Sequence, residues 1–166
     1  MRASSAVLIG VVALAAILAT HADARAARAC GARGAERPLL ARPVGGAIFS
    51  TFGPRYHPLL GYMRLHSGVD YAAEAGDHVR VAAAGRVVAA GRETGYGKRV
   101  VVRHAHDLKT AYAHLGTIRV RTGSCVEAGA VIGKIGKTGT AGSPAHLHFE
   151  VIQSGRFVDP ARVVGW

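Results

Sequence analysis

The stretch His146-Leu147-His148-Phe149-Glu150-Val151 alternates polar and apolar side chains. Successive side chains of a β-strand point to opposite faces of the sheet, so this alternation predicts a strand. We expect the three apolar side chains to face a hydrophobic core. The two histidines and Glu150 then share the other face, where both histidines are predicted to face an open cleft.

Short β-branched runs punctuated by glycine extend outward from this stretch through most of the chain. Such runs are typical of strands joined by tight turns, and no segment after Val44 shows a helical stripe. The sequence therefore predicts an all-β, or at least β-dominated, domain. The other expected strands lie within residues 78–90, 98–104, 110–114, 118–120 and 131–134.

The N-terminus has the features of an export signal. Met1-Arg2 is followed by an apolar run from Ala6 to Ala19, and Ala22-Asp23-Ala24 resembles a cleavage site. The run is short for a membrane span, so we expect residues 1–24 to be a signal peptide that is removed on export. An uncleaved membrane anchor is the alternative. Either reading places the folded part outside the cytoplasm, secreted or in a periplasm.

The remaining residues suffice for one compact domain with a hydrophobic core and are too few for two. Residues 25–43 are rich in alanine, arginine and glycine and are expected to form a flexible tail, with the domain at residues 44–166. The formal net charge of +11 favours anionic partners such as cell-wall polymers. Nucleic acid is not an expected partner outside the cytoplasm, and simple solubility explains the charge equally well.

The two cysteines, Cys30 and Cys125, lie far apart in the sequence. In an oxidising compartment they can form one disulfide that ties the tail to the domain. Two free thiols are the alternative, because the sequence does not give the distance between them.

Several histidines and one aspartate form a pattern that suits a metal. A catalytic zinc site needs three nitrogen or oxygen ligands and one open position. His146 and His148 lie at i and i+2, about 7 Å apart on one strand face. His66 and Asp70 lie at i and i+4, so Gly68 is expected to allow a bend that brings them together. Taken singly, each pair is explained as well by a surface position or a structural hydrogen bond.

Five stretches together resemble the M23 family of metallopeptidases, the LytM or lysostaphin type. The resemblance extends from about Phe52 to Pro160 and rests on these stretches: Phe52-Gly53-Pro54-Arg55, His66-Ser67-Gly68-Val69-Asp70-Tyr71-Ala72-Ala73, Gly95-Tyr96-Gly97, Thr110-Ala111-Tyr112-Ala113-His114-Leu115 and His146-Leu147-His148-Phe149-Glu150. It implies that His66, Asp70 and His148 bind zinc and that His114 and His146 assist catalysis. It also implies a compact antiparallel β domain with a groove walled by loops.

The function that the resemblance implies is zinc-dependent hydrolysis of peptide cross-links in peptidoglycan. Zinc would activate water, and His114 and His146 would share the work of base and of oxyanion stabiliser. D,D-cross-links are the preferred substrate, with glycine-containing bridges as the alternative. Expected partners are the peptidoglycan peptide and a regulatory protein that opens or blocks the groove. The competing hypotheses are a non-catalytic module that activates wall amidases and a basic wall-binding scaffold.

Two departures from the family pattern and several further residues complete the sequence-based picture. The loop before the His-x-His pair reads Ser143-Pro144-Ala145 in place of the usual Gly-Pro, and no coiled-coil or wall-targeting module is present.

Tyr62 and Tyr112 are candidate additional donors to the oxyanion, and Glu150 is expected to support a ligand or to lie on the surface. The histidines without an assigned partner are His57, His78, His104 and His106, and a second metal site is not expected.

Overall fold

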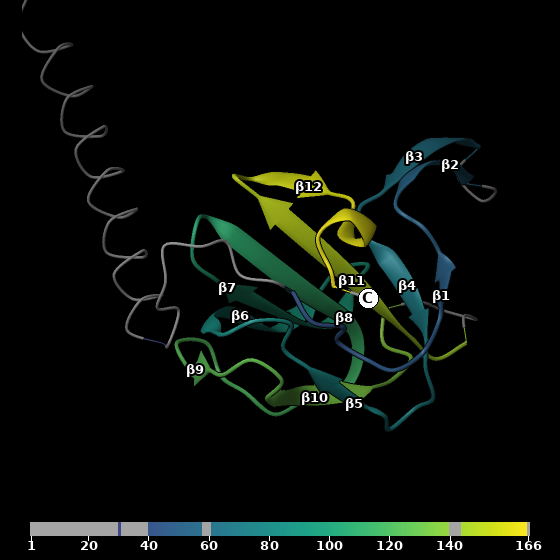
Figure 1. Ribbon diagram of the computed structural model, residues 1–166. Helices are drawn as coiled ribbons and strands as arrows, with labels where there is room; N and C mark the ends of the chain where they lie inside the picture. Colours follow the sequence, from purple (N-terminus) through teal and green to yellow (C-terminus); the bar gives the residue numbers. More distant parts are fainter. Residues whose placement is uncertain (1–29, 31–39, 58–60, 140–143, 166) are drawn as a thin grey trace, which may run out of the picture.

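The computed structural model describes residue 30 and residues 40–57, 61–139 and 144–165 of the 166-residue chain. The described residues form strands connected by short turns, with one 3-10 helix near the C-terminus (Figure 1). The elements are β1 (Ile48–Ser50), β2 (Gly53–His57), β3 (Tyr62–His66), β4 (Val69–Ala72), β5 (His78–Arg80), β6 (Gly85–Glu93), β7 (Gly97–Arg103), β8 (Leu108–Ile118), β9 (Cys125–Val126), β10 (Val131–Ile135), β11 (His146–Gln153), β12 (Arg156–Val158) and η1 (Pro160–Arg162). The prediction of an all-β domain is confirmed.

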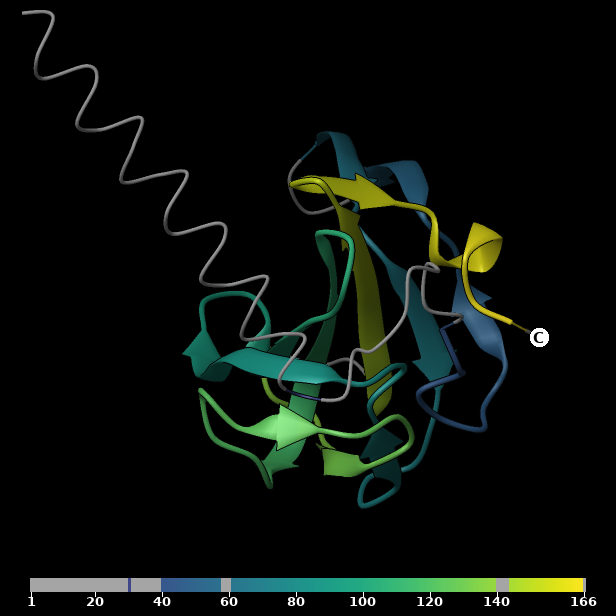
Figure 2. The same cartoon turned by 60° about the vertical axis from the view of Figure 1, so that its left-hand side comes forward.

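One large sheet holds ten of these strands. Its main path runs β1-β4-β11-β8-β7-β6-β9, with β12 added to β11 and the pair β5–β10 added to β8. Every strand pair in it is antiparallel. Figure 2 shows that the sheet is strongly curved, so that β5, β9 and β10 close off one end. The expected antiparallel architecture is therefore present.

Strand β11 lies in the middle of this sheet, between β4 and β8. The alternation in its sequence has the predicted consequence: Leu147, Phe149 and Val151 are fully buried in the main hydrophobic core. The histidines and Glu150 face the other side of the sheet, yet they are also buried. These side chains are therefore recessed from solvent, and the open cleft that the alternation suggested is not confirmed.

The expected strand at residues 78–90 is two strands separated by a turn. Strand β5 pairs with β10, whereas β6 pairs with β7 and β9. The break falls in the alanine-rich segment Val81–Gly85, where the Ala82 carbonyl accepts from Ala41 N and the Ala82 N–H donates to the Tyr112 hydroxyl. These partners replace a sheet ladder, so the chain changes direction without losing backbone hydrogen bonds.

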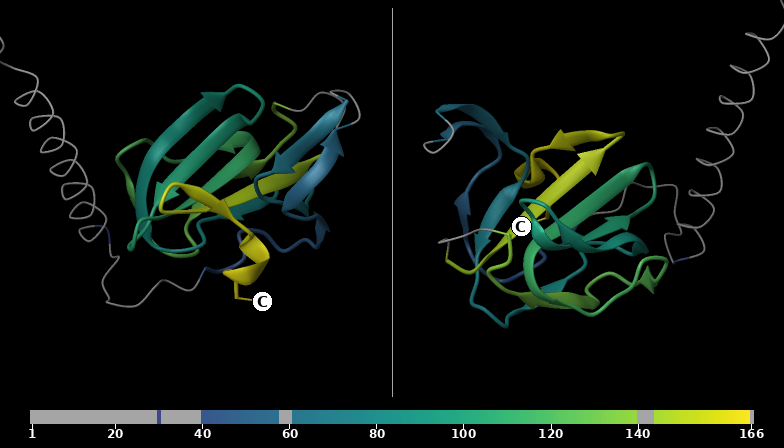
Figure 3. Two further views of the ribbon diagram at one scale, coloured as in Figure 1. Left: turned by 90° about the horizontal axis from the view of Figure 1, so that it is seen from above. Right: turned by 180° about the vertical axis from the view of Figure 1, so that it is seen from behind.

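The hairpin β2–β3 forms a separate two-stranded sheet. It projects beyond the large sheet beside β12, as the view from above shows (Figure 3). Its second strand ends at His66, and only Ser67 and Gly68 separate it from β4. The hairpin therefore joins the large sheet at the residues on which the metal hypothesis depends.

The N-terminal segment is tied to the domain at two points. Cys30 forms a disulfide with Cys125 of β9, and Leu40 is buried and bridged to Val164. Packing against the domain thus begins at least four residues before the expected boundary at residue 44. The expected signal peptide lies outside the described residues. Within the described residues no helix has the length and apolar character of a membrane span.

Candidate metal centre

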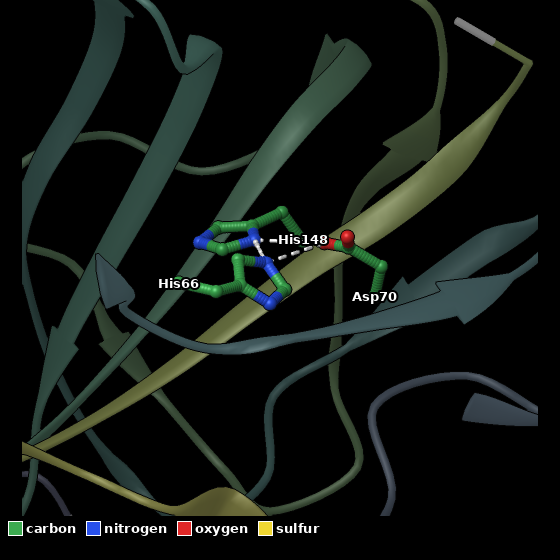
Figure 4. Close-up of side chains that lie close together, drawn as sticks. All are labelled: His66, Asp70 and His148. Carbon is green, nitrogen blue, oxygen red and sulfur yellow. Dashed lines mark hydrogen bonds and ion pairs between the residues drawn. The ribbon is translucent and has the colours of Figure 1, made fainter. Parts of the chain in front are cut away.

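His66, Asp70 and His148 converge on one point, as the close-up in Figure 4 shows. His66 Nε2 lies 3.2 Å from Asp70 Oδ1 and 3.1 Å from His148 Nδ1, and Asp70 Oδ1 lies 2.8 Å from His148 Nδ1. All three side chains are buried. Sequence reasoning singled out these residues as zinc ligands, and the fold brings their donor atoms within 4.8 Å of one another.

Two local features bring the three side chains together. Asp70 and His148 are direct partners in the register of β4 and β11, so their side chains share one face of the sheet. His66 arrives from the hairpin through a bend at Gly68. A Cβ atom at residue 68 would lie 2.2 Å from the Phe149 carbonyl oxygen. Glycine is therefore needed for close approach to β11, in addition to the bend that the sequence predicted.

The hydrogen bonds on the far sides of the rings fix which nitrogen faces the centre. His66 Nδ1 lies 2.7 Å from the Thr51 carbonyl, to which it can only donate. His148 Nε2 donates in the same way to Glu150. In the neutral imidazoles, His66 Nε2 and His148 Nδ1 are then lone-pair acceptors. Three acceptors, including the Asp70 carboxylate, meet with no proton donor among them, an arrangement that a cation stabilises.

The electrostatics of the centre lead to the same conclusion. Burial would raise the pKa of Asp70, but in the absence of a cation His148 and His66 can act as donors to the carboxylate, and these interactions lower its pKa well below the usual range. Burial would lower the pKa of His148, but Asp70 and Glu150 raise it above its ordinary value. The protein therefore holds an ionised carboxylate here and favours positive charge beside it.

Glu150 lies behind His148 and is fully buried, so the surface position that the sequence allowed is excluded. Its carboxylate accepts hydrogen bonds from Ser67 Oγ and the Tyr96 hydroxyl, and it forms an ion pair with Arg99. Burial would raise its pKa, but the hydrogen bonds from His148 and Ser67 and the charge of Arg99 lower it to about 2. Sequence reasoning assigned no role to Tyr96 or Arg99, because their approach to Glu150 depends on the pairing of β7 with β8 and of β8 with β11.

His114 and His146 lie beside the three acceptors. Their ring centroids are 4.7 Å apart, and His114 lies 5.9 Å from His148. His114 Nδ1 donates to the Thr138 carbonyl and His146 Nδ1 to the Pro144 carbonyl, each at 2.9 Å. Both Nε2 atoms are therefore free to accept a proton. Burial, the largest influence, lowers the pKa of His114, so this ring is neutral near pH 7.

The backbone of His114 has a φ of 60°, in the left-handed region that non-glycine residues seldom occupy. Its N–H donates to the Tyr96 carbonyl, and its own carbonyl accepts from Gly136 N. These bonds hold the ring against the centre at a cost in backbone strain. Such strain is typical of positions where side-chain placement serves function.

Comparison with known proteins identifies the family of the chain. Residues 64–160, more than half of the chain, match peptidase family M23. The chain belongs to this family. Among curated relatives, it is 46% identical over 116 residues to the DD-carboxypeptidase/endopeptidase Mpg of Neisseria meningitidis, which covers 70% of this chain and 26% of the relative.

Two further M23 comparisons bear on the centre. The chain is 37% identical over 121 residues to the murein hydrolase activator NlpD of Escherichia coli, covering 72% of this chain and 30% of the relative. A crystal structure of a zinc-containing peptidase from Vibrio cholerae superimposes with a TM-score of 0.70 at 36% identity, covering 75% of this chain and 39% of that one. The chain thus spans about a quarter to a third of the length of these curated relatives.

A hollow of about 870 Å³ lies next to the histidine pair of this M23 domain. The ring of Phe49 stands edge-on to His146, with centroids 5.8 Å apart, and Phe49 also lines the hollow. The other lining residues include Ala72, Glu74 and Pro144. The hollow therefore extends the surface that a bound peptide can contact beyond the metal centre.

The remaining candidate residues are two tyrosines and the histidines without an assigned partner. Tyr112 was a candidate oxyanion donor, and that prediction is wrong: the side chain is fully buried in the core and its hydroxyl accepts from Ala82 N. Tyr62 is exposed on β3 and stays a candidate. His104 is buried and hydrogen-bonded at both ring nitrogens. His78 and His106 are exposed.

Proposed function

We propose that this M23 domain is a zinc-dependent endopeptidase that hydrolyses peptide cross-links of peptidoglycan. The observation that carries the proposal is the meeting of three buried acceptors, His66 Nε2, Asp70 Oδ1 and His148 Nδ1, with no donor among them. Because the chain covers only part of its curated relatives, the activity of the whole protein is also a proposal.

The donor set fits zinc. Two imidazole nitrogens and one carboxylate oxygen are common zinc ligands, and three protein ligands leave a position open, as catalytic sites require. Glu150 holds His148 from behind and Thr51 holds His66, which is the kind of outer support that zinc ligands usually have. A bound zinc ion supplies a Lewis acid that polarises a carbonyl and makes water nucleophilic near neutral pH.

His114 and His146 move protons in this mechanism. Each is anchored through Nδ1 to a backbone carbonyl, so each keeps an Nε2 lone pair that can accept a proton. One Nε2 takes the proton from the attacking water, and the other, when protonated, donates to the oxyanion of the tetrahedral intermediate. The histidine that took the proton from water then donates this proton to the leaving amine.

The preferred bond is the D,D-cross-link between stem peptides. Mpg, the relative with 46% identity, is a DD-carboxypeptidase/endopeptidase by its name. A glycine-containing bridge is the alternative substrate. We further propose that residues 1–24 are a cleaved export signal and that the domain acts outside the cytoplasm, with a regulatory protein that controls access to the groove.

The second candidate function is that of a non-catalytic activator, which the 37% identity with NlpD supports. An activator does not need a complete metal centre or proton-moving histidines. This chain has all three ligand residues and both histidines in place, which favours the enzyme.

One experiment separates these functions. Purified sacculi are incubated with the protein, with the protein after chelation, and with the chelated protein after zinc is restored, and released muropeptides are identified by mass spectrometry. The enzyme predicts new fragments that disappear with the chelator and return with zinc. Fragments that appear only when an amidase is added would support the activator, and no fragments under any condition would refute both.

A further inference from the structure

The hairpin β2–β3 sorts its side chains onto two faces. Residues directly opposite in an antiparallel pair share a face, and the register pairs Arg55 with Arg64. Residue i+2 returns to the same face, so Arg64 lies on the face of His66, whose ring enters the metal centre. The opposite face carries the exposed apolar residues Pro54, Tyr56, Met63 and Leu65.

A hydrogen bond independently places Arg55 on the side of the centre. Its Nη1 donates to Ser50 Oγ at 2.6 Å. Ser50 is the register partner of Asp70, so its side chain shares the sheet face of that metal-centre residue. Both arginines are nevertheless exposed to solvent. They form a cationic pair on the rim of the centre and not part of its interior.

This pair is unfavourable for the folded protein taken alone. Like charges directly opposite each other on two strands are destabilising. Within the described part of the chain, no carboxylate lies within ion-pair distance of Arg55 or Arg64. Local arrangements that lower stability without internal compensation are expected at functional positions. An external anion between the two guanidinium groups would supply the compensation.

We propose that Arg55 and Arg64 bind a carboxylate of the peptide substrate and thereby select substrates with a free carboxylate near the scissile bond. Guanidinium groups bind planar carboxylates through paired, charge-assisted hydrogen bonds. The strand rise places the Cα of Arg64 about 7 Å from that of His66. An extended peptide covers about 3.5 Å per residue, so the bound carboxylate belongs to a residue about two to four positions from the bond that is cut. The proposal rests on the proposed function for its substrate.

Paired substrates test this subsite. Cross-linked stem-peptide dimers are prepared with a free carboxylate near the cross-link and with the same group as a carboxamide. For the wild type we expect KM to be lower for the free carboxylate, by about tenfold to a hundredfold, as for a hydrogen bond between charged groups. In the double variant Arg55→Gln/Arg64→Gln this preference should disappear, with kcat little changed. Arg119→Gln, an exposed arginine beyond β8, is the matched control.

A binding measurement on chelated protein separates this proposal from the proposed function. Fluorescence anisotropy with the same labelled dimers reports affinity without cleavage, and circular dichroism on heating reports folding. A preference of the chelated wild type for the carboxylate, lost in the double variant at an unchanged or higher melting temperature, supports the subsite even if no dimer is cleaved. Equal affinity of the wild type for both dimers, or a preference that survives in the double variant, would overturn it.

Discussion

Two buried clusters, one around His104 and one formed by His66, Asp70 and His148, differ in one property, the balance of hydrogen-bond donors and acceptors. Behind the sheet, His104 Nδ1 donates to the Ala84 carbonyl, and its Nε2 accepts from Thr110 Oγ1. Thr110 Oγ1 in turn accepts from the Tyr112 hydroxyl, which accepts from Ala82 N. Every donor and every acceptor in this series of hydrogen bonds has a partner of the opposite kind.

The candidate metal centre has no such balance. There His66, Asp70 and His148 present three acceptors to one another, while their outer atoms already have partners. Both clusters are buried and rich in hydrogen bonds, so burial does not distinguish a structural histidine from a ligand. The donor count does: a balanced cluster stabilises the fold by itself, and an excess of acceptors requires a cation.

The largest expected effect is a loss of activity after a change in the cluster with excess acceptors, the candidate metal centre. His148→Ala removes one of three acceptors, and we expect hydrolysis of sacculi to fall by more than ~100-fold, beyond the range for loss of an outer support. The measurement is zinc-dependent release of muropeptides. His106→Asn, a change at an exposed histidine that does not line the hollow, is the matched control and should keep wild-type activity. Full activity in His148→Ala would show that His148 is not a ligand of the metal.

Glu150→Gln tests the support of His148. The amide can still accept from His148 Nε2 but loses the charge that pairs with Arg99. We expect zinc affinity to fall by about 10- to 100-fold, measured by competition with a chromogenic chelator. Glu127→Gln, at an exposed position after β9, should leave the affinity unchanged. Unchanged zinc affinity in Glu150→Gln would mean that the Glu150 carboxylate contributes to folding and not to zinc binding.

Tyr112→Phe tests the balanced cluster. The change leaves the Ala82 N–H without an acceptor and removes the donor to Thr110 Oγ1, which keeps its own hydrogen bond to His104. We expect the free energy of unfolding to fall by about 1–3 kcal/mol, measured with urea, while zinc affinity stays at the wild-type value. A loss of zinc affinity without a loss of stability would contradict the division between the two clusters.

The smallest expected effect is on the pH dependence of stability. Burial lowers the pKa of His104 below its ordinary value of 6.5. Above pH 6.5 the ring is neutral in both folded and unfolded chains, so its full contribution to stability is present. As the pH falls below 6.5, the unfolded chain takes up the proton first and stability decreases, by at most about 1.4 kcal/mol per pH unit.

The measurement is the difference in unfolding free energy between the wild type and His104→Gln, on chelated protein from pH 7.5 to pH 5. Taking the difference cancels the opposite contribution of His148, whose pKa is raised. The difference should decrease toward acid pH. A difference that is independent of pH would mean that His104 is protonated equally in both states.

The sequence by itself determined the class of the fold and the membership of the site. Alternation over residues 146–151 depends only on the period of a strand, which is why it correctly assigned Leu147 and Phe149 to the core. The spacing of His66, Asp70 and the His-x-His pair, together with the family resemblance, identified the residues that converge.

The tertiary structure decided which groups lie around those residues. Glu150, Tyr96 and Arg99 meet only because β11, β8 and β7 are neighbours in the sheet, and strand order is not encoded in local periodicity. The same holds for Tyr112: it would share a face with His114 in a regular strand, but a register irregularity in β8 near His114 separates the two side chains. Hydrogen-bond donors must be counted across strands distant in sequence, and so only the folded chain distinguishes the balanced cluster at His104 from the three acceptors at His148.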